Sequence, residues 1–226
     1  QAGVADDAAP SAAPHAPQTD VLLGRGSLLL RAPRTGPHAH LANSCVACHM
    51  AEPDAALRGR AGGHTFSVRD LGSSSRILAG PTCSACHGAQ VPPQAIGEIR
   101  DWDGDGVSDN VGREFDRALR MARATLRTRI AFARVRDGCP GERLGQDYVE
   151  YDAQLLLVDG EGHLLGDCDG DRSFGETEEA IGVGQLSREL RKVVWDVAMI
   201  DKDGSRGRHN PSFAFDILSA VQRNLR

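Results

Sequence analysis

Two copies of one five-residue pattern constrain this chain more than any other feature of its sequence. The segments CVACH (45–49) and CSACH (83–87) both read C-x-x-C-H, which is the attachment signature of c-type haem. Two thiols at this spacing reach the two vinyl groups on one porphyrin edge, and the next histidine is carried to the iron. We therefore expect two covalent haems, whose thioether and proximal residues are Cys45, Cys48, His49, Cys83, Cys86 and His87.

A zinc site built from the two cysteine pairs is the alternative. Zinc modules usually separate such pairs by about 15–20 residues, whereas 34 residues (49–82) lie between these pairs. Covalent haem attachment takes place outside the cytoplasm, so we expect a periplasmic, extracellular or surface location after signal-peptide cleavage. Cys139 and Cys168 fit this oxidising setting as a disulfide, with two free thiols as the alternative.

The sixth ligand of each iron separates an electron carrier from a haem enzyme, because an open iron binds or activates small molecules. The methionines are poor candidates: Met50 directly follows His49, and Met121 and Met199 lie in helical patterns. Bis-histidine ligation of both haems is therefore the economical reading. The histidines outside the two motifs are His15, His38, His40, His64, His163 and His209.

Two of these histidines are favoured as distal ligands by their local sequence. His64 follows two glycines, which allow the backbone to approach a porphyrin closely. His209 precedes Asn210-Pro211, which is a typical helix start, so its side chain would be held rigidly. His38 and His40, just before the first motif, are rivals, while His163 lies in a glycine-rich turn.

Two acidic segments resemble calcium-binding loops, in which alternating carboxylates surround a turn. In the first loop, Gly112 stands where a bidentate Glu is usual, and Glu114 is the nearest substitute. An acidic turn without a metal is the alternative for both loops, and 201–205 has too few carboxylates to be more than a turn. The expected ligands are Asp101, Asp103, Asp105, Val107 (carbonyl) and Asp109 in the first loop, and Asp167, Asp169, Asp171 and Glu178 in the second.

The rest of the chain is expected to be mainly α with much irregular loop. It holds 26 Gly and 11 Pro but few aromatic residues, so a haem-centred core would replace some packing of large side chains. Periodicity predicts helices over 113–136, 185–200 and 211–225, and a small β-hairpin over 154–159 and 163–167. The arginine-rich 113–136 helix would face haem propionates, the acidic loops or solvent. Its apolar stripe is Phe115, Leu119, Ala122, Leu126, Ile130 and Ala133.

Taken together, these segments resemble a family of bacterial extracytoplasmic multihaem c-type cytochromes. The matching pieces are NSCVACHM (43–50), GGHTF (62–66), CSACHG (83–88), DWDGDG (101–106) and DKDGSRGRHNPSFAFDIL (201–218). The resemblance implies that the HTF and HNP histidines, His64 and His209, are distal haem ligands. This chain departs from the family in having two haem motifs and an insertion at 137–180, which holds Cys139 and Cys168.

The two motifs start 38 residues apart (45 to 83), too close for two separate cytochrome domains of about 100 residues. We expect one dihaem domain over 21–226 that transfers electrons to other redox proteins or to copies of itself. The Ala/Pro-rich arm 1–20 would dock on a neighbouring subunit in a filament, with His15 as a candidate ligand in trans. The alternatives are a reductase or dihaem peroxidase with one open iron, and a calcium-dependent surface module.

Composition excludes two further classes of function. The net charge of −5 rules out a broad cationic surface for nucleic acid. No apolar run approaches the roughly 18 residues of a membrane span.

Overall fold

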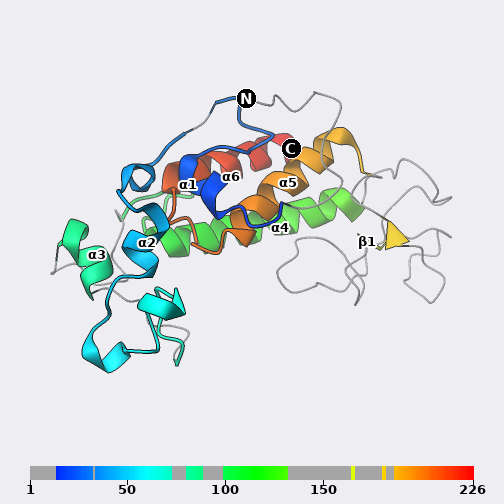
Figure 1. Cartoon of the computed structure of the whole chain (residues 1–226). Coiled ribbons are helices and arrows are strands. Elements are labelled where there is room, and N and C mark those ends of the chain that lie inside the picture. The colour runs from blue at the N-terminus through cyan, green and yellow to red at the C-terminus, as the bar shows by residue number, and fades with distance from the viewer. Residues whose placement is uncertain are drawn as a thin grey trace.

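The structure is a computed structural model that describes residues 14–32, 34–72, 80–88, 99–131, 164–165, 180–181 and 186–226. Figure 1 shows its longer helices side by side, with the short helices of the two C-x-x-C-H motifs at one end. The elements are α1 (Gln18–Leu23), η1 (Pro37–His40), α2 (Ser44–His49), η2 (Ala55–Leu57), η3 (Gly63–Thr65), α3 (Gly80–His87), α4 (Val111–Ala131), β1 (Leu164–Leu165), β2 (Ala180–Ile181), α5 (Arg188–Lys202) and α6 (Pro211–Leu225).

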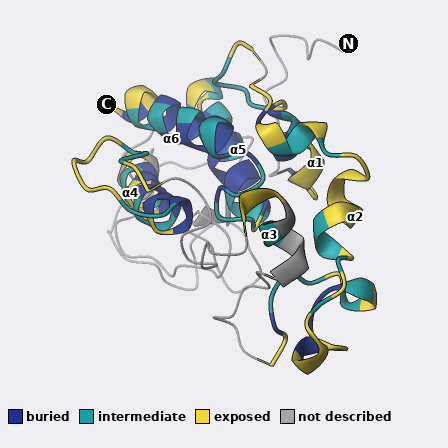
Figure 2. Cartoon of the chain, turned by 90° about the vertical axis from the view of Figure 1, so that its left-hand side faces the viewer, coloured by how far each residue is buried: buried dark blue, intermediate teal, exposed yellow. Residues whose placement is uncertain are grey.

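The main hydrophobic core lies among α4, α5 and α6, each of which packs against the other two. These helices form because their apolar residues recur at helical spacing and leave a polar face for solvent. Figure 2 shows long buried stretches on α5 and α6. The largest fully buried side chains include Phe213, Leu126, Leu186, Met199, Ile200 and Ile217.

The starts of α5 and α6 are fixed by side-chain caps. Ser187 accepts a hydrogen bond from the Leu190 amide (3.3 Å), and Asn210 accepts one from the Phe213 amide (3.2 Å). Pro211 occupies the first turn of α6, where its missing N–H removes no helical hydrogen bond. The predicted start of the last helix at Asn210-Pro211 is therefore confirmed.

The N-terminal segment is tied to this bundle by buried polar groups. The Asp196 carboxylate on α5 accepts hydrogen bonds from the Ser27 hydroxyl and from the Leu28 and Leu29 amides. Asn210 donates its side-chain amide to the Arg34 carbonyl (2.6 Å). Because these groups are satisfied, the irregular segment that follows α1 is held against α5 and α6 at 27–29 and at Arg34. Helix α1 begins at Gln18, inside the predicted arm 1–20.

The haem-motif region, residues 36–72 and 80–88, has little regular structure and very few buried apolar residues. Its described buried hydrophobic residues are Leu57 and Ala61, which form a small separate cluster. An ion pair between Arg60 and the buried Asp70 closes the loop between 60 and 70. In Figure 2, α2 and the loops beside it are coloured mainly as exposed or intermediate.

The expectation of a mainly helical chain with irregular loops is confirmed. Helix α4 begins at Val111, and its predicted stripe is buried at Phe115, Leu119, Ala122 and Leu126. Strand β1 (Leu164–Leu165) pairs antiparallel with β2 (Ala180–Ile181), whereas 154–159 lie outside the described residues, so the hairpin stays a prediction. No helix in the described part of the chain is both long and apolar enough to span a membrane.

Candidate functional site

The two C-x-x-C-H motifs lie on two short helices that pack against each other, α2 and α3. All four of their cysteines carry free thiols. Burial, followed by the nearby Cys86 and Cys45, raises the pKa of the Cys48 thiol. Burial and then Cys48 raise the pKa of the Cys83 thiol. The electrostatic influence of each pair on the other shows that the two motifs are close neighbours.

The ring of each motif histidine lies close to the ring of a histidine from a distant part of the chain. The ring centres of His49 and His209 are 6.2 Å apart, and those of His87 and His38 are 6.1 Å apart. With metal–nitrogen bonds of about 2.0 Å and ring centres about 1.1 Å further out, two imidazoles on opposite sides of one metal have centres roughly 6 Å apart. Both separations therefore fit one iron between each pair of rings.

Hydrogen bonds at Nδ1 leave Nε2 as the remaining nitrogen on three of these four rings. His49 Nδ1 is 2.9 Å from the Phe66 carbonyl oxygen, and His38 Nδ1 is 2.9 Å from the Arg208 carbonyl oxygen. His209 Nδ1 is 2.6 Å from a carboxylate oxygen of Asp203. Histidines that ligate a metal usually donate their second ring nitrogen in this way, which fixes both tautomer and orientation.

Three exposed apolar side chains lie on or beside α2, the helix that carries His49. Val46, Met50 and Phe66 are each more than two-fifths exposed, and the Phe66 ring stacks on the His49 ring at 4.8 Å. Exposed apolar side chains gathered at one place usually mark a site that a ligand or partner covers. A porphyrin on α2 would cover these side chains, so the residues present fit a haem.

The predicted ligand His64 lies in η3, and its side chain is exposed. Within the described residues, ring contacts of the proximal histidines involve Phe66, His209 and His38, and none involves His64. Gly62 has a positive φ of 62°, and a Cβ there would lie 2.1 Å from the Ala51 carbonyl oxygen. This glycine is thus required for a close approach between two segments of the chain itself.

The remaining predicted histidines, cysteines and acidic residues are either exposed or outside the described residues. His15 and His40 are exposed, so the role of His15 as a ligand in trans stays a prediction. His163, Cys139, Cys168 and the second acidic loop, with Asp167, Asp169, Asp171 and Glu178, lie outside the described residues. The disulfide and the second calcium site therefore also stay predictions.

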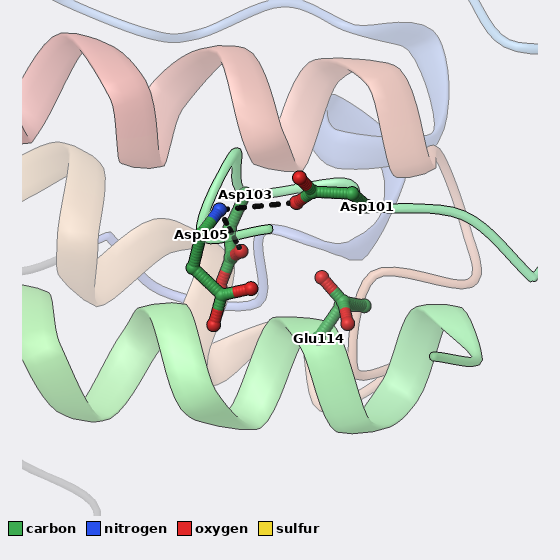
Figure 3. Close-up of side chains that lie close together, drawn as sticks. All are labelled: Asp101, Asp103, Asp105 and Glu114. Carbon is green, nitrogen blue, oxygen red and sulfur yellow. Dashed lines mark hydrogen bonds between the residues drawn. The ribbon is translucent and has the colours of Figure 1, made fainter. Parts of the chain in front are cut away.

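The first acidic loop brings four carboxylates together. Ligand atoms of Asp101, Asp103, Asp105 and Glu114 all lie within 4.8 Å of one another, and Figure 3 shows Glu114 reaching from α4 toward the loop. The Asp101 carboxylate accepts hydrogen bonds from three loop amides, including that of Gly104 (2.7 Å). These bonds shape the loop. Glu114 supplies the carboxylate that is missing at Gly112, whereas Asp109 is not a member of the group.

One oxygen of this cluster lacks a hydrogen bond. Asp103 Oδ2 is buried and accepts none from any described residue, although Arg117 Nε lies 3.6 Å away. Burial, the largest cause, raises the pKa of this carboxyl, and a hydrogen bond from the Asp105 amide opposes the rise. A buried oxygen without a partner is the kind of group that a bound cation satisfies.

The guanidinium of Arg117, on α4, supplies a positive charge among the carboxylates of the first acidic loop. The guanidinium contacts Glu114, lies 2.7 Å from Asp105 Oδ2, and donates to the Val107 carbonyl oxygen (3.4 Å). These are three of the groups expected to bind calcium. Of the partners left open for the arginines of this helix, the acidic loop is the one that Arg117 contacts, whereas Arg123 forms an ion pair with Asp201.

Two residues that support the histidine pairs had no predicted role. Phe66 both stacks on His49 and accepts its Nδ1–H. Asp203, in the segment interpreted as a plain turn, holds His209. The spacing Asp203 to His209 carries no known signature, but an acidic residue in the turn that leads to a ligand was a usable signal.

A scan against protein-family models, a search of curated proteins and a search of solved structures each found no match to this chain.

Proposed function

We propose that this chain is a dihaem c-type cytochrome that transfers electrons. The first haem would be bound at Cys45 and Cys48 between His49 and His209. The second would be bound at Cys83 and Cys86, between His87 and His38. The observation that carries the proposal is the pairing of each motif histidine with a distant histidine at 6.2 and 6.1 Å.

Each bound haem supplies a reversible one-electron couple, and the residues determine whether it does more. With histidine nitrogens on both sides, no coordination position is left for a substrate, which favours a carrier over a reductase or peroxidase. The contact between α2 and α3 keeps the two attachment sites close, as transfer between haems requires. His38 rather than His64 is proposed as the second distal ligand, because His38 has both the ring spacing and the Nδ1 hydrogen bond.

The test is the visible spectrum of the reduced, haem-loaded protein with and without carbon monoxide. We expect two haems per chain and no spectral change in the wild type. His209→Ala and His38→Ala should each make one haem able to bind carbon monoxide, whereas His64→Ala and His40→Ala should leave both spectra unchanged. A chain without covalent haem would overturn the proposal. A carbon monoxide shift in the wild type would favour the enzyme instead.

We also propose that the first acidic loop binds calcium with a structural role. The buried Asp103 Oδ2 and the fully buried Glu114 support this reading, since calcium prefers six to eight oxygen ligands. Calcium would displace the Arg117 guanidinium from Asp105, Glu114 and the Val107 carbonyl.

The filament and the extracytoplasmic location belong to the proposed cytochrome function, and both rest on the sequence alone.

A further inference from the structure

The two distal histidines of the proposed function differ in what holds them. His209 Nδ1 is bound to the Asp203 carboxylate at 2.6 Å, whereas His38 Nδ1 is bound to the neutral Arg208 carbonyl at 2.9 Å. The carbonyl group that accepts the bond from His38 belongs to Arg208, the residue before His209. The single segment 203–209 therefore orients the proposed distal ligands of both haems. The charge of the acceptor is therefore the main difference between the two contacts.

Asp203 is a buried carboxylate with its other oxygen also engaged. Its side chain is 1% exposed, and Oδ2 accepts hydrogen bonds from the Ser205 hydroxyl and amide. The Ser205 hydroxyl oxygen in turn accepts one from the His209 amide (3.1 Å). Within the described part of the chain, no arginine or lysine forms an ion pair with Asp203, so its negative charge is directed mainly at His209.

A positive charge lies on the side of the second motif. Arg208 is half-buried, and its carbonyl oxygen lies 2.9 Å from Nδ1 of His38, the proposed distal ligand of the second haem. Its guanidinium lowers the pKa of the Cys83 thiol, although burial still raises that pKa overall. It therefore acts electrostatically on one of the two cysteines that would bind the second haem. Arg206 lies nearby but is paired with Asp116.

These two charges have opposite effects on an iron's preference for its oxidised state. A carboxylate on Nδ1 makes the imidazole a stronger electron donor through Nε2, which stabilises the oxidised iron. A half-buried cation close to a haem stabilises the reduced state, because it compensates the charge of the added electron where solvent screens it only in part. Both effects separate the two reduction potentials in the same direction.

We propose that Asp203 and Arg208 order the two haems, so that the haem at Cys45–Cys48 has the lower reduction potential and the haem at Cys83–Cys86 the higher. This inference rests on the proposed function and gives it a direction. One electron passes from the first iron, which is oxidised, to the second, which is reduced, and no bond or proton has to move. Asp203 is a positioning residue in this proposal, since it acts through His209.

The test is a potentiometric titration of the haem-loaded full chain, followed by the visible spectrum. The two midpoints are assigned with Cys83→Ala/Cys86→Ala, which keeps the first haem alone. Asp203→Asn should favour reduction of the first haem at least tenfold, which is about 59 mV upward for one electron, and leave the second midpoint unchanged. Ser205→Ala should shift the first midpoint downward, because the Asp203 carboxylate then has one hydrogen bond fewer.

Matched variants make each outcome decisive. Asp203→Glu keeps the charge and should retain a midpoint near that of the wild type, and Arg208→Gln should lower the second midpoint. Asp216→Asn, on α6 and paired with Arg34, should change neither midpoint. Equal shifts of both haems in Asp203→Asn, an unchanged first midpoint, or a first haem with the higher potential would overturn the inference. In all three cases two haems that do not bind carbon monoxide would leave the proposed function intact.

Discussion

The bundle of α4, α5 and α6 and the haem-motif region (36–72 and 80–88) are built on different principles. The bundle and the residues packed against it bury more than twenty apolar or aromatic side chains in one cluster, among them Phe213, Leu126 and Ile217. In the haem-motif region the described buried hydrophobic residues are Leu57 and Ala61. Val46, Met50 and Phe66 are instead exposed there.

This difference shows what each region needs in order to be stable. Burial of a large apolar side chain contributes about 1.5–3 kcal/mol, so the bundle can order itself. The haem-motif region buries too little to offset the entropy of ordering its backbone, which is about 1–2 kcal/mol per residue. In the proposed cytochrome, the bound haems and the hydrogen bonds at the histidine rings would supply that order.

The largest effect is expected when haem attachment is abolished. In a variant with Cys45, Cys48, Cys83 and Cys86 all replaced by Ala, residues 36–72 and 80–88 should lose protection against amide hydrogen exchange. Helices α4 to α6 should keep most of theirs, because their core contains no part of either motif. If the haem-motif region stayed as protected as in the loaded protein, the comparison between the two regions would be wrong.

A cavity in the bundle tests the other half of the comparison. Phe213→Ala should lower the free energy of unfolding by about 3–5 kcal/mol, because it leaves a large cavity in a fully buried site. Chemical denaturation followed by the helical circular dichroism signal measures this loss. Met121→Ala, at an exposed position of α4, is the control and should change stability little. Loss of both haem spectra at the same denaturant concentration in Phe213→Ala would show that the regions unfold as one unit.

Sequence reasoning succeeded in the bundle because periodicity and caps are local signals. The buried stripe of α4 and the Asn210-Pro211 start of α6 were both readable from spacing. The starting boundary of α5 was approximate, since the Ser187 cap lies two residues after the expected start at 185, and the helix begins at Arg188. The caps and the apolar spacing that specify these helices involve residues within about four positions of one another along the chain.

The site was less predictable because its contacts join residues far apart in the sequence. The two motifs and the carboxylates at 101, 103 and 105 have fixed spacings, and so were found. The pairing of His38 with His87 spans 49 positions (38 to 87) and has no spacing rule, so His38 was left among the rivals. Asp203 was missed because its role depends on where the His209 ring turns in the folded chain.

The link between α5 and the N-terminal segment should depend on pH. Burial raises the pKa of Asp196 to about 6, although hydrogen bonds from Ser27, Leu28 and Leu29 favour the charged form. Between the unfolded value near 3.8 and about 6, the folded chain holds a proton that the unfolded chain has released. Stability from this group is therefore lost as pH rises through that window, by up to about 3 kcal/mol.

The measurement is the difference in unfolding free energy between the wild type and Asp196→Asn from pH 4 to pH 7. The wild type should lose stability relative to the variant up to about pH 6, and the difference should then be constant. Asp216→Asn, with its more exposed carboxylate, provides the comparison. A difference that does not vary with pH would mean that Asp196 is charged throughout.

The smallest expected effect concerns Arg117, which connects the bundle to the acidic loop. Arg117→Gln removes the guanidinium from among Asp103, Asp105 and Glu114, so calcium no longer has to displace it. We expect calcium to bind about tenfold more tightly in calorimetric titration of the haem-loaded chain with calcium alone. Arg113→Gln, whose 3.6 Å ion pair is with Asp109 outside the cluster, should change the affinity little. If Arg117→Gln bound calcium no better than the wild type, Arg117 would not compete with calcium for the site. If neither the wild type nor Arg117→Gln bound calcium, the Arg117 guanidinium itself would be the cation that the carboxylates of the loop bind.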